Sequence, residues 1–583
     1  ALVVGMFLIY TTLSFLVVQR RQLIGIERAL GVTQRQLFTV ILAEALLLGA
    51  AGTMAGLLLG GWLGDGLVSL VLRTVEDLYF AREVTAVPAN PWIYTKGAAL
   101  GLGATLLAAL APVLEAARLP PRFAMSRAAL ESRTRRRLPG LALVGLACLA
   151  LAAGLLAIAT RSLVIAFAGL FCVIAAAALF TPAATLGFLR MVERPAAWLG
   201  HLPGRLAARS AAASLSRTGV AVVALSIAVA TVIGVGVMIG SFRTSVETWL
   251  SDTLQSDFYL RLAPGIPAQS SAALSPAAVA SIAALPGVAG LSLSRWLRLP
   301  TRDGEILLRA TEPGPRGWGL AIIEGDPDAV WQAFASDSAV VVSEPFARRN
   351  GVGVGAVLEL PTPTGPAEFP VAGVFRDYSS DRGAVMMQLG AYRRHWRDES
   401  LSGVGVYLEP QADVGAVRRA LERHAAAMLD LQLGASADLR IASMQIFERT
   451  FTITAVLRWL AGLVAFFGIL SALSALALER ARELAVLRAI GFAPAQLRGL
   501  VLVETGLLGL ASGLVAIPVG LALAALLVFV INERAFGWSM ALQLQPAVLA
   551  GGLLLALAAA LLAGVLPAWR MSRVPLAATL REE

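Results

Sequence analysis

Nine long runs of apolar residues dominate this chain and constrain its fold more than any other feature. A helix of about 20 apolar residues is needed to cross the roughly 30 Å hydrocarbon core of a bilayer. With a mean hydropathy of +0.74, the chain is too apolar for an ordinary soluble protein. The runs predict a polytopic α-helical membrane protein with spans at 1–18, 37–64, 93–116, 141–159, 163–189, 219–241, 457–478, 497–531 and 546–568.

The loops between these runs differ in charge. Three of them, at 20–35, 118–137 and 190–217, are rich in arginine, and cytoplasmic loops are the ones that carry excess Arg and Lys. The long segment 242–450 has 19 Arg against 23 Asp and Glu, a net charge of −4 within a chain of +10. We therefore place 242–450 outside the cytoplasm. The basic charge lies where orientation and anionic lipid require it, which argues against nucleic-acid binding.

The chain begins Ala-Leu-Val-Val inside the first apolar run and has no initiator Met. We interpret the sequence as lacking its N-terminal part, and we expect one further span before residue 1. The full-length protein would then have ten spans, with both ends in the cytoplasm.

An internal repeat relates the two ends of the chain. A shift of 460 residues aligns 28–51 with 488–511 at 11 identities in 24 positions, without a gap. Aligned Arg, Gln and Glu exclude a chance match of apolar residues, so the repeat predicts two copies of one three-span unit. The domains expected are a first unit at 1–120, a basic linker with two spans at 121–218, a span leading outward at 219–241, an external domain at 242–452 and a second unit at 453–583.

The chain has no site that the sequence marks as catalytic or metal-binding. Lys96 is its single lysine and lies in Tyr-Thr-Lys-Gly-Ala, so the chain holds no phosphate-binding P-loop. The two cysteines and three histidines are too far apart to match known metal-ligand spacings. We expect no bound cofactor or metal and no enzymatic activity of its own.

Each unit has the same local design, a span followed by a short charged helix, a glycine and the next span. Gly31 and Gly491 suit left-handed helix-ending positions. The following helix starts with a Thr33–Gln36 capping box in one unit and with Pro494 in the other. The short helices are amphipathic, which is typical of a helix lying at the membrane surface or docking to a cytoplasmic partner.

The string Gln-Leu-Ile-Gly-Ile-Glu-Arg-Ala-Leu-Gly at 22–31 and its second copy, Arg-Glu-Leu-Ala-Val-Leu-Arg-Ala-Ile-Gly at 482–491, resemble the FtsX-like permease family of ABC transporters. This family includes MacB-type and lipoprotein-releasing permeases. The resemblance implies that the short helices couple to a separate ABC ATPase, in two copies, which uses ATP and Mg²⁺. The residues that it assigns to coupling are Arg20, Arg21, Glu27, Arg28, Gly31, Arg480, Arg482, Glu483, Arg488 and Gly491. It also implies a bacterial cytoplasmic (inner) membrane location.

Glu44 and Glu504 are unusual because they lie in apolar helices, about two turns from the cytoplasmic end. They occupy equivalent positions in the two units. We expect each to form an intramembrane pair, with Arg28 and Arg488 as the candidate partners, or to take part in coupling.

The external segment is expected to be an α+β domain that resembles the MacB-type extracytoplasmic domain. Strand-like runs lie at 257–262, 340–343, 356–360, 369–375 and 405–409, with helices at 277–285 and 417–427. The segment 361–365 predicts a hairpin with a long loop. Two stalk helices, one continuing outward past residue 241 and one returning from 446, would join this domain to the membrane.

Exposed polar and aromatic residues offer candidate external contacts. Asp377 and Asp381 fit either a cation site or a solvated turn, with the turn favoured, and Tyr392 and Trp396 fit either a lipid contact or core packing. A periplasmic or lipoprotein partner and membrane lipid are the expected external partners.

The favoured function is an ABC permease subunit that converts ATP hydrolysis by its partner into movement of external domains, for export or extraction of a lipid, lipoprotein or other amphipathic substrate. The alternative is an FtsX-like regulator that activates an external cell-wall hydrolase without transport. A secondary transporter is disfavoured because it would require ionisable groups and broken helices at the membrane midplane.

Overall fold

A computed structural model gives the fold. It describes residues 2–79, 91–118, 131–158, 162–198, 202–262, 274, 276–301, 304–380, 382–427, 431–448 and 490–571, with scattered single residues between 451 and 488.

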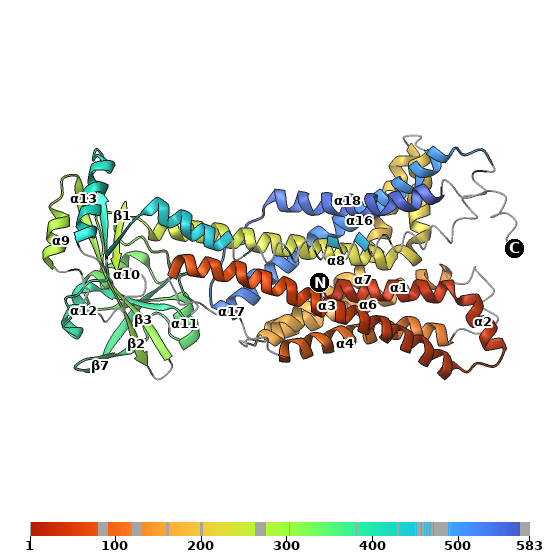
Figure 1. The fold of residues 1–583 in the computed structure, drawn as a ribbon, viewed down its shortest axis with the longest axis horizontal. Coiled ribbons are helices and arrows are strands. Elements are labelled where there is room, and N and C mark those ends of the chain that lie inside the picture. Colours follow the sequence, from red (N-terminus) through yellow and green to blue (C-terminus); the bar gives the residue numbers. More distant parts are fainter. Residues whose placement is uncertain are drawn as a thin grey trace.

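The molecule is elongated, with a mixed sheet domain at one end and long helices running lengthwise from it (Figure 1). The chain is thus a polytopic α-helical membrane protein with an inserted α+β domain. Its helices in the membrane part are α1 (Leu2–Gln19), α2 (Arg21–Ala29), α3 (Gln34–Tyr79), α4 (Pro91–Arg118), α6 (Glu131–Ala157), α7 (Leu163–Trp198), α8 (Leu202–Thr253), α16 (Pro494–Leu526), η1 (Leu527–Asn532), α17 (Glu533–Phe536) and α18 (Pro546–Met571).

Seven helical stretches within the described residues are long and apolar enough to cross a membrane, and each coincides with a predicted span. The predicted span 1–18 corresponds to α1, whereas 457–478 falls largely outside the described residues. The helices extend beyond the apolar runs. The external loop expected from residue 66 begins with α3, which continues to Tyr79, and part of the linker expected before 141 is helical from Glu131.

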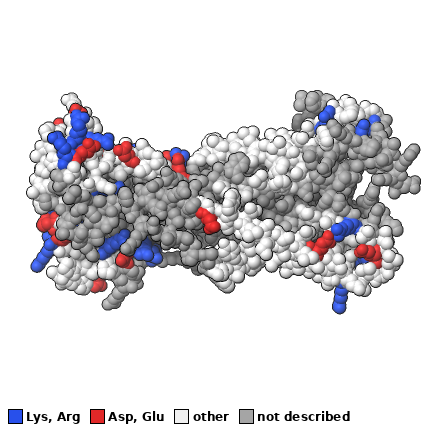
Figure 2. Space-filling view, in the orientation of Figure 1, with Lys and Arg blue, Asp and Glu red and all other residues white. Residues whose placement is uncertain are grey.

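The charge distribution agrees with a membrane around the middle of the molecule. Charged side chains gather over the sheet domain and at the opposite end, and few are visible between them (Figure 2). Trp62 of α3 and Trp92 at the start of α4 are exposed, as aromatic residues at a membrane surface often are. The ammonium of Lys96 lies 5.4 Å from the Trp92 ring.

The external domain is built on a ten-stranded mixed sheet in the order β10-β1-β9-β2-β3-β8-β5-β7-β4, with β6 paired to β7. All five predicted strands and both predicted helices are present. The strands are β1 (Phe258–Leu262), β2 (Val288–Thr301), β3 (Gly304–Glu312), β4 (Ile322–Glu324), β5 (Val340–Ser343), β6 (Val357–Thr362), β7 (Gly365–Phe375), β8 (Ala384–Gln388), β9 (Gly403–Leu408) and β10 (Leu431–Ala435), and the helices are α9 (Pro276–Ala283), α10 (Pro327–Ala335), α11 (Glu344–Asn350), α12 (Leu389–Trp396) and α13 (Val414–Ala427).

The prediction of a long loop between β6 and β7 is wrong. Thr362 pairs with Gly365, so only Pro363 and Thr364 form the turn. Gly365 has a φ of +119°, which a residue with a side chain rarely adopts, and this allows the strands to continue closer to the turn than the two prolines suggest.

The two repeat units use equivalent close contacts between their last two helices. A Cβ added at Gly49 of α3 would lie 2.4 Å from Thr105 of α4, and one added at Gly509 of α16 would lie 2.5 Å from Ala560 of α18. Ala560 is the position equivalent to Thr105 in the repeat. Small residues allow helix backbones to approach closely in lipid, where packing drives association. The repeat seen in the sequence is therefore also a repeat of helix packing.

Candidate coupling site and stalk

The first coupling segment is a helix held between two membrane helices. After α1 ends, α2 turns along the end of the bundle, and Gly31 ends it with a φ of +101°. The Gly31 amide donates to the Arg28 carbonyl (3.2 Å) and the Val32 amide to the Glu27 carbonyl (3.0 Å), which satisfies carbonyls that the helix end leaves free. The predicted capping box is confirmed, because the Thr33 amide donates to Gln36 Oε1 (3.0 Å) and the Gln36 amide to Thr33 Oγ1 (3.3 Å).

One apolar residue anchors α2 and three others face away from the protein. Ile24 is 5% exposed and packs into a cluster with α1, α3 and α4. By contrast, Leu23, Ile26 and Leu30 are 57%, 60% and 81% exposed. Ile24 therefore anchors α2 to the bundle, while large apolar side chains remain exposed on its outer face.

The basic residues of the first segment tie it to neighbouring helices. Arg28 Nη1 donates to the carbonyl of Ala117 at the end of α4 (2.7 Å), and Arg20 Nη1 forms an ion pair with Glu44 Oε2 (2.8 Å). Glu44 thus pairs with Arg20 and not with the predicted candidate, Arg28. Arg20 lies one residue beyond the end of α1, where the chain turns into α2, and this turn brings its side chain to Glu44.

The second coupling segment repeats the turn. Gly491 has a φ of +104°, its amide donates to the Arg488 carbonyl (3.1 Å), and the Ala493 amide donates to Gln496 Oε1 (2.9 Å). Pro494 starts α16 as predicted, and Ile490 is 72% exposed. Arg480, Arg482 and Glu483 lie outside the described residues, as does the side chain of Arg21.

Glu504 has a different environment from Glu44. Its side chain is buried, and its two oxygens accept hydrogen bonds from Ser210 Oγ (2.9 Å) and Ser214 Oγ (3.2 Å), both on α8. A carboxylate in an apolar helix bundle requires such donors because its burial is otherwise costly. The predicted contact with Arg488 stays a prediction.

Helix α8 connects this contact to the external domain. Its 52 residues span about 78 Å at 1.5 Å per residue, and it is the most buried of the candidate spans. Contacts with the second unit follow its whole length. Ser226 Oγ donates to the Ser512 carbonyl (3.2 Å), Gly234 and Gly520 form a close approach, and Ser241 Oγ accepts from the Gln543 amide (3.0 Å).

Beyond the apolar run, an aromatic cluster encloses the outer part of α8. The helix continues outward past residue 241 as predicted, and Phe242, Val246 and Leu250 of this extension pack in the cluster. The Phe242 ring stacks on Trp538 at 5.7 Å and lies 5.2 Å from Phe447, and the Tyr378 hydroxyl donates to the Ser539 carbonyl (2.7 Å). Residues from α8, the sheet domain and the loop after α17 thus form one packed junction.

A set of polar contacts between Glu344 and Ser539, called the Glu344–Ser539 latch, strengthens this junction. The buried Glu344 of α11 accepts from the Ser539 amide (3.0 Å) and from its hydroxyl (2.9 Å). The next turn of α11 brings Arg348 into contact with both Glu344 and Glu533 of α17. Charge-assisted hydrogen bonds of this kind are stronger than neutral ones. The external domain is therefore fastened directly to the outer end of the second unit.

Two candidate external contact residues serve the core of the domain instead. Tyr392 and Trp396 are buried and stacked on each other, so the default of core packing is confirmed. Tyr392 donates to Asp398 Oδ2 (2.7 Å), and burial together with this hydrogen bond raises the pKa of Tyr392 to about 12. Burial acts to raise the Asp398 pKa, but hydrogen bonds from Ser400 and Tyr392 and the charge of Arg295 outweigh it and lower that pKa.

Asp377 fits the solvated-turn alternative in part. It is buried and accepts from the Ser379 amide (3.0 Å) and hydroxyl (2.8 Å), so its carboxylate stabilises its own turn. Asp381 lies outside the described residues.

Comparison with known proteins decides the family. The family described as FtsX-like permease C-terminal matches residues 1–121 and 455–576, the two repeat units, and the MacB-like periplasmic core domain matches 218–424. An uncharacterized ABC transporter permease protein of Mycobacterium tuberculosis is 40% identical over 593 residues, which cover all of this chain and 69% of that protein. The chain belongs to the FtsX-like ABC transporter permeases. It is thus a multi-pass protein of the bacterial cytoplasmic membrane and a transport subunit, and its family works with a partner ATPase.

Two solved structures are similar to parts of this permease. The periplasmic region of MacB from Actinobacillus actinomycetemcomitans covers 33% of this chain and 95% of its own, with 13% identity and a TM-score of 0.25. The extracellular domain of the noncanonic ABC-type transporter YknZ from Gram-positive bacteria covers 29% and 94%, with 15% identity and a TM-score of 0.22.

Sequence reasoning missed Ser210, Ser214 and the Glu344–Ser539 latch of the permease. Two serines one helical turn apart in a long helix are a weak signal, since most such serines bond to their own backbone. Ser214 and Glu504 are 290 residues apart in the sequence, and only the tertiary fold brings them together.

Proposed function

We propose that this permease converts ATP hydrolysis by a separate ABC ATPase into movement of its external domain. Two copies of the ATPase would dock, one at α2 and one at the equivalent helix of the second unit. The ATP and Mg²⁺ belong to the partner, and this chain supplies docking surfaces and levers.

The observation that carries the proposal is the continuous helix α8. It contacts Glu504 of the second unit near the cytoplasmic end through Ser210 and Ser214, and it reaches the sheet domain about 60 Å farther along without a break. A helix with intact hydrogen bonds along its length transmits displacement because its packed neighbours resist bending. A shift of α16 at the coupling turn would therefore be passed to the external junction.

The substrate class is proposed to be a lipid, a lipoprotein or another amphipathic molecule. Ionisable groups are scarce in the described spans, so a hydrophilic solute has no polar pathway there. The charged side chains visible in Figure 2 lie mostly at the two ends of the molecule, so an amphipathic molecule would be handled at the outer membrane surface.

Charge reversal in the coupling segment tests the proposal. The permease is co-purified with its ATPase, reconstituted into liposomes, and assayed for substrate-stimulated ATP turnover. Arg28→Glu removes the tie to Ala117 and Ile26→Asp alters the exposed apolar surface, so each is expected to lower the stimulated turnover about 10-fold or more, a coupling loss of about 1.4 kcal/mol.

The control is Arg35→Glu, which reverses an exposed charge at the same end of the molecule, outside α2. It should retain turnover close to that of the wild type. Unchanged turnover in Arg28→Glu and Ile26→Asp would overturn the docking assignment.

The identity of the external partner distinguishes transport from the alternative function, which is regulation of an external cell-wall hydrolase. Purification of the full chain from native membranes that yields a bound lipid or lipoprotein supports transport. A cell-wall hydrolase bound to the external domain, with no lipid transfer in proteoliposomes, would replace transport by regulation.

A further inference from the structure

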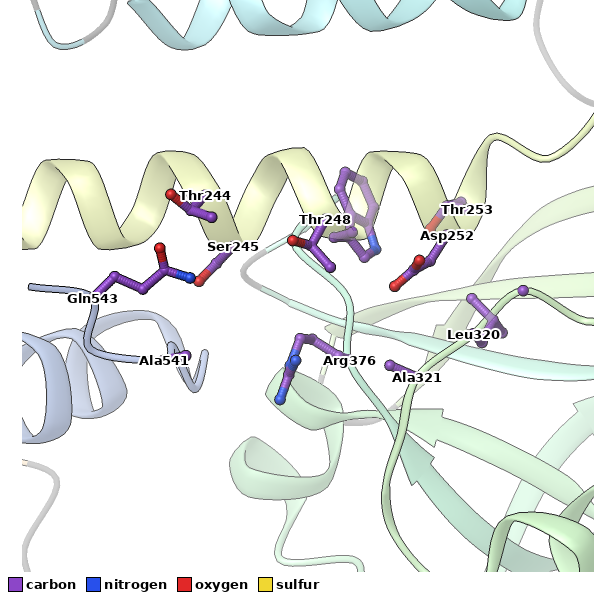
Figure 3. Close-up of a pocket in the computed structure, with 12 residues that line it drawn as sticks. Thr244, Ser245, Thr248, Asp252, Thr253, Leu320, Ala321, Arg376, Ala541 and Gln543 are labelled. Atoms are coloured by element: carbon purple, nitrogen blue, oxygen red, sulfur yellow. The ribbon is translucent and has the colours of Figure 1, made fainter. Parts of the chain in front are cut away.

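A cavity of about 220 Å³ lies between the outer part of α8, the loop before β4, the residues after β7 and the loop before α18. Figure 3 shows Thr244, Ser245, Thr248 and Asp252 along α8, with Arg376 and Ala321 below them and Gln543 at the other end. At about 30 Å³ per water, the cavity has the volume of about seven waters, enough for a small polar group and too little for an acyl chain.

The cavity has one group of each charge. Arg376 comes from the segment after β7 and Asp252 from the last turn of α8, so the two walls carry opposite charges (Figure 3). Within the part of the chain that the structure describes, neither side chain forms an ion pair or a hydrogen bond. Arg376 Nε and Thr253 Oγ1 are both buried without a hydrogen-bond partner among those residues.

Buried polar atoms beside a cavity gain hydrogen bonds when water or a ligand fills it, because a buried polar group without a partner is costly. A simple anion would gain from Arg376 but would be repelled by Asp252. A molecule with both charges satisfies both groups, while the hydroxyls of Ser245 and Thr248 and the amide of Gln543 offer further hydrogen bonds.

The position of the cavity agrees with a lipid headgroup. Residues 244–252 lie about 5–17 Å along α8 beyond residue 241, the last residue of the predicted span. The headgroup layer of one leaflet is about 5–8 Å thick. The Thr244 end therefore lies at headgroup level and the Asp252 end lies beyond it, an order that suits a phosphate near the membrane and an ammonium farther out.

We propose that this cavity binds a phosphoethanolamine group, with its phosphate at Arg376 and its primary ammonium at Asp252, presented by a lipid of the outer leaflet. The inference deepens the proposed function, since it names the headgroup of an amphipathic ligand. It concerns binding alone and needs no ATPase, so the two proposals can fail separately.

The test measures lipid bound to the full-length permease in detergent by native mass spectrometry. Phosphatidylethanolamine is compared with phosphatidylcholine, whose quaternary ammonium donates no N–H bond, and with phosphatidylglycerol, which has no ammonium. The wild type is expected to bind phosphatidylethanolamine at least about 5-fold more tightly than either. Arg376→Gln and Asp252→Asn should each abolish this preference.

Matched controls are Arg382→Gln and Asp328→Asn, which neutralise exposed charges of the same domain outside the cavity and should keep the preference. Thr248→Phe fills the cavity without changing charge, and it should also remove binding. Thermal unfolding of each variant establishes that the domain is folded when binding is lost.

Three results would overturn the proposal. Equal binding of the three lipids would show that the cavity holds only water. Tighter binding of phosphatidylglycerol, lost in Arg376→Gln alone, would show an anion site. Competition by free phosphoethanolamine at the affinity of the lipid itself would show that the ligand is a soluble zwitterion and not a membrane lipid. Loss of ATPase coupling with lipid selectivity intact would instead count against the proposed function only.

Discussion

The two FtsX-like units have closely similar sequences around their coupling turns but place their intramembrane glutamates in different environments. Glu44 has a side chain that is 34% exposed and pairs with Arg20 of its own unit. Glu504 is 5% exposed, and its partners Ser210 and Ser214 come from α8, outside the repeat. Equivalent residues thus differ because the second unit packs against the stalk helix. The repeat accounts for the structure that the two units share, and the neighbouring helix α8 accounts for the different environment of Glu504.

The largest expected difference in stability is between the single variants Glu504→Ala and Glu44→Ala. Glu504→Ala deletes the hydrogen bonds from Ser210 and Ser214 and leaves a cavity at a buried site, so it should destabilise the permease by about 2–4 kcal/mol. Glu44→Ala removes a partly exposed ion pair and should cost at most about 1 kcal/mol. Reversible unfolding in mixed micelles measures both, and equal losses would break the distinction between the units.

A glycine pair tests the packing with α8. A Cβ at Gly520 would lie 2.7 Å from Ile233 and 2.9 Å from the backbone oxygen of Ala230, whereas Gly60, its equivalent, has open space around it. Gly520→Ala should therefore destabilise by about 1–3 kcal/mol through overpacking. Gly60→Ala should be neutral or stabilising by up to about 1 kcal/mol, because alanine favours a helix. The two variants are compared in the same unfolding assay, and a shared sign would contradict the asymmetry.

The coupling turns should respond alike. Gly31 and Gly491 have φ values of +101° and +104°, and neither has a neighbouring atom within 4 Å of an added Cβ. Replacement by Val is therefore penalised by backbone conformation alone, about 1–2 kcal/mol at each site. ATP turnover of the reconstituted complex should fall in both variants. A loss in only one would show that the two units engage the ATPase unequally.

The core of the external domain provides a pH probe at a site outside both units. The folded-state pKa of Tyr392, about 12, lies above the ordinary value of 10, so the neutral hydroxyl stabilises the fold. This contribution is complete below pH 10 and is lost as pH rises from 10 towards 12. The free energy of unfolding should decrease less between pH 9 and pH 11 in Tyr392→Phe than in the wild type. Gly520→Ala should keep the wild-type pH dependence because it adds no titratable group, and the same pH dependence in Tyr392→Phe and the wild type would contradict the assignment to Tyr392.

Much of this architecture follows from the sequence because its causes are local or periodic. Apolar runs of sufficient length must be buried in lipid, arginine fixes their orientation, and a repeat of 24 aligned positions predicts equivalent turns. The Thr33–Gln36 box and the left-handed Gly31 were predictable because each involves atoms only a few residues apart. Five strands of the external domain, β1, β5, β6, β7 and β9, were predicted from local patterns in the same way, whereas the other five and the tight β6–β7 turn were not.

Only the tertiary structure decided which distant groups meet. The partners of Glu504 depend on how far α8 is shifted along α16, and the Glu344–Ser539 latch depends on the orientation of a whole domain. A displacement of one residue, 1.5 Å along a helix and 100° around it, would separate these groups without altering any local pattern. Sequence periodicity therefore determined the membrane fold and the coupling turns. Long-range packing determined which glutamate is buried, how the external domain is fastened, and where Arg376 and Asp252 face one cavity.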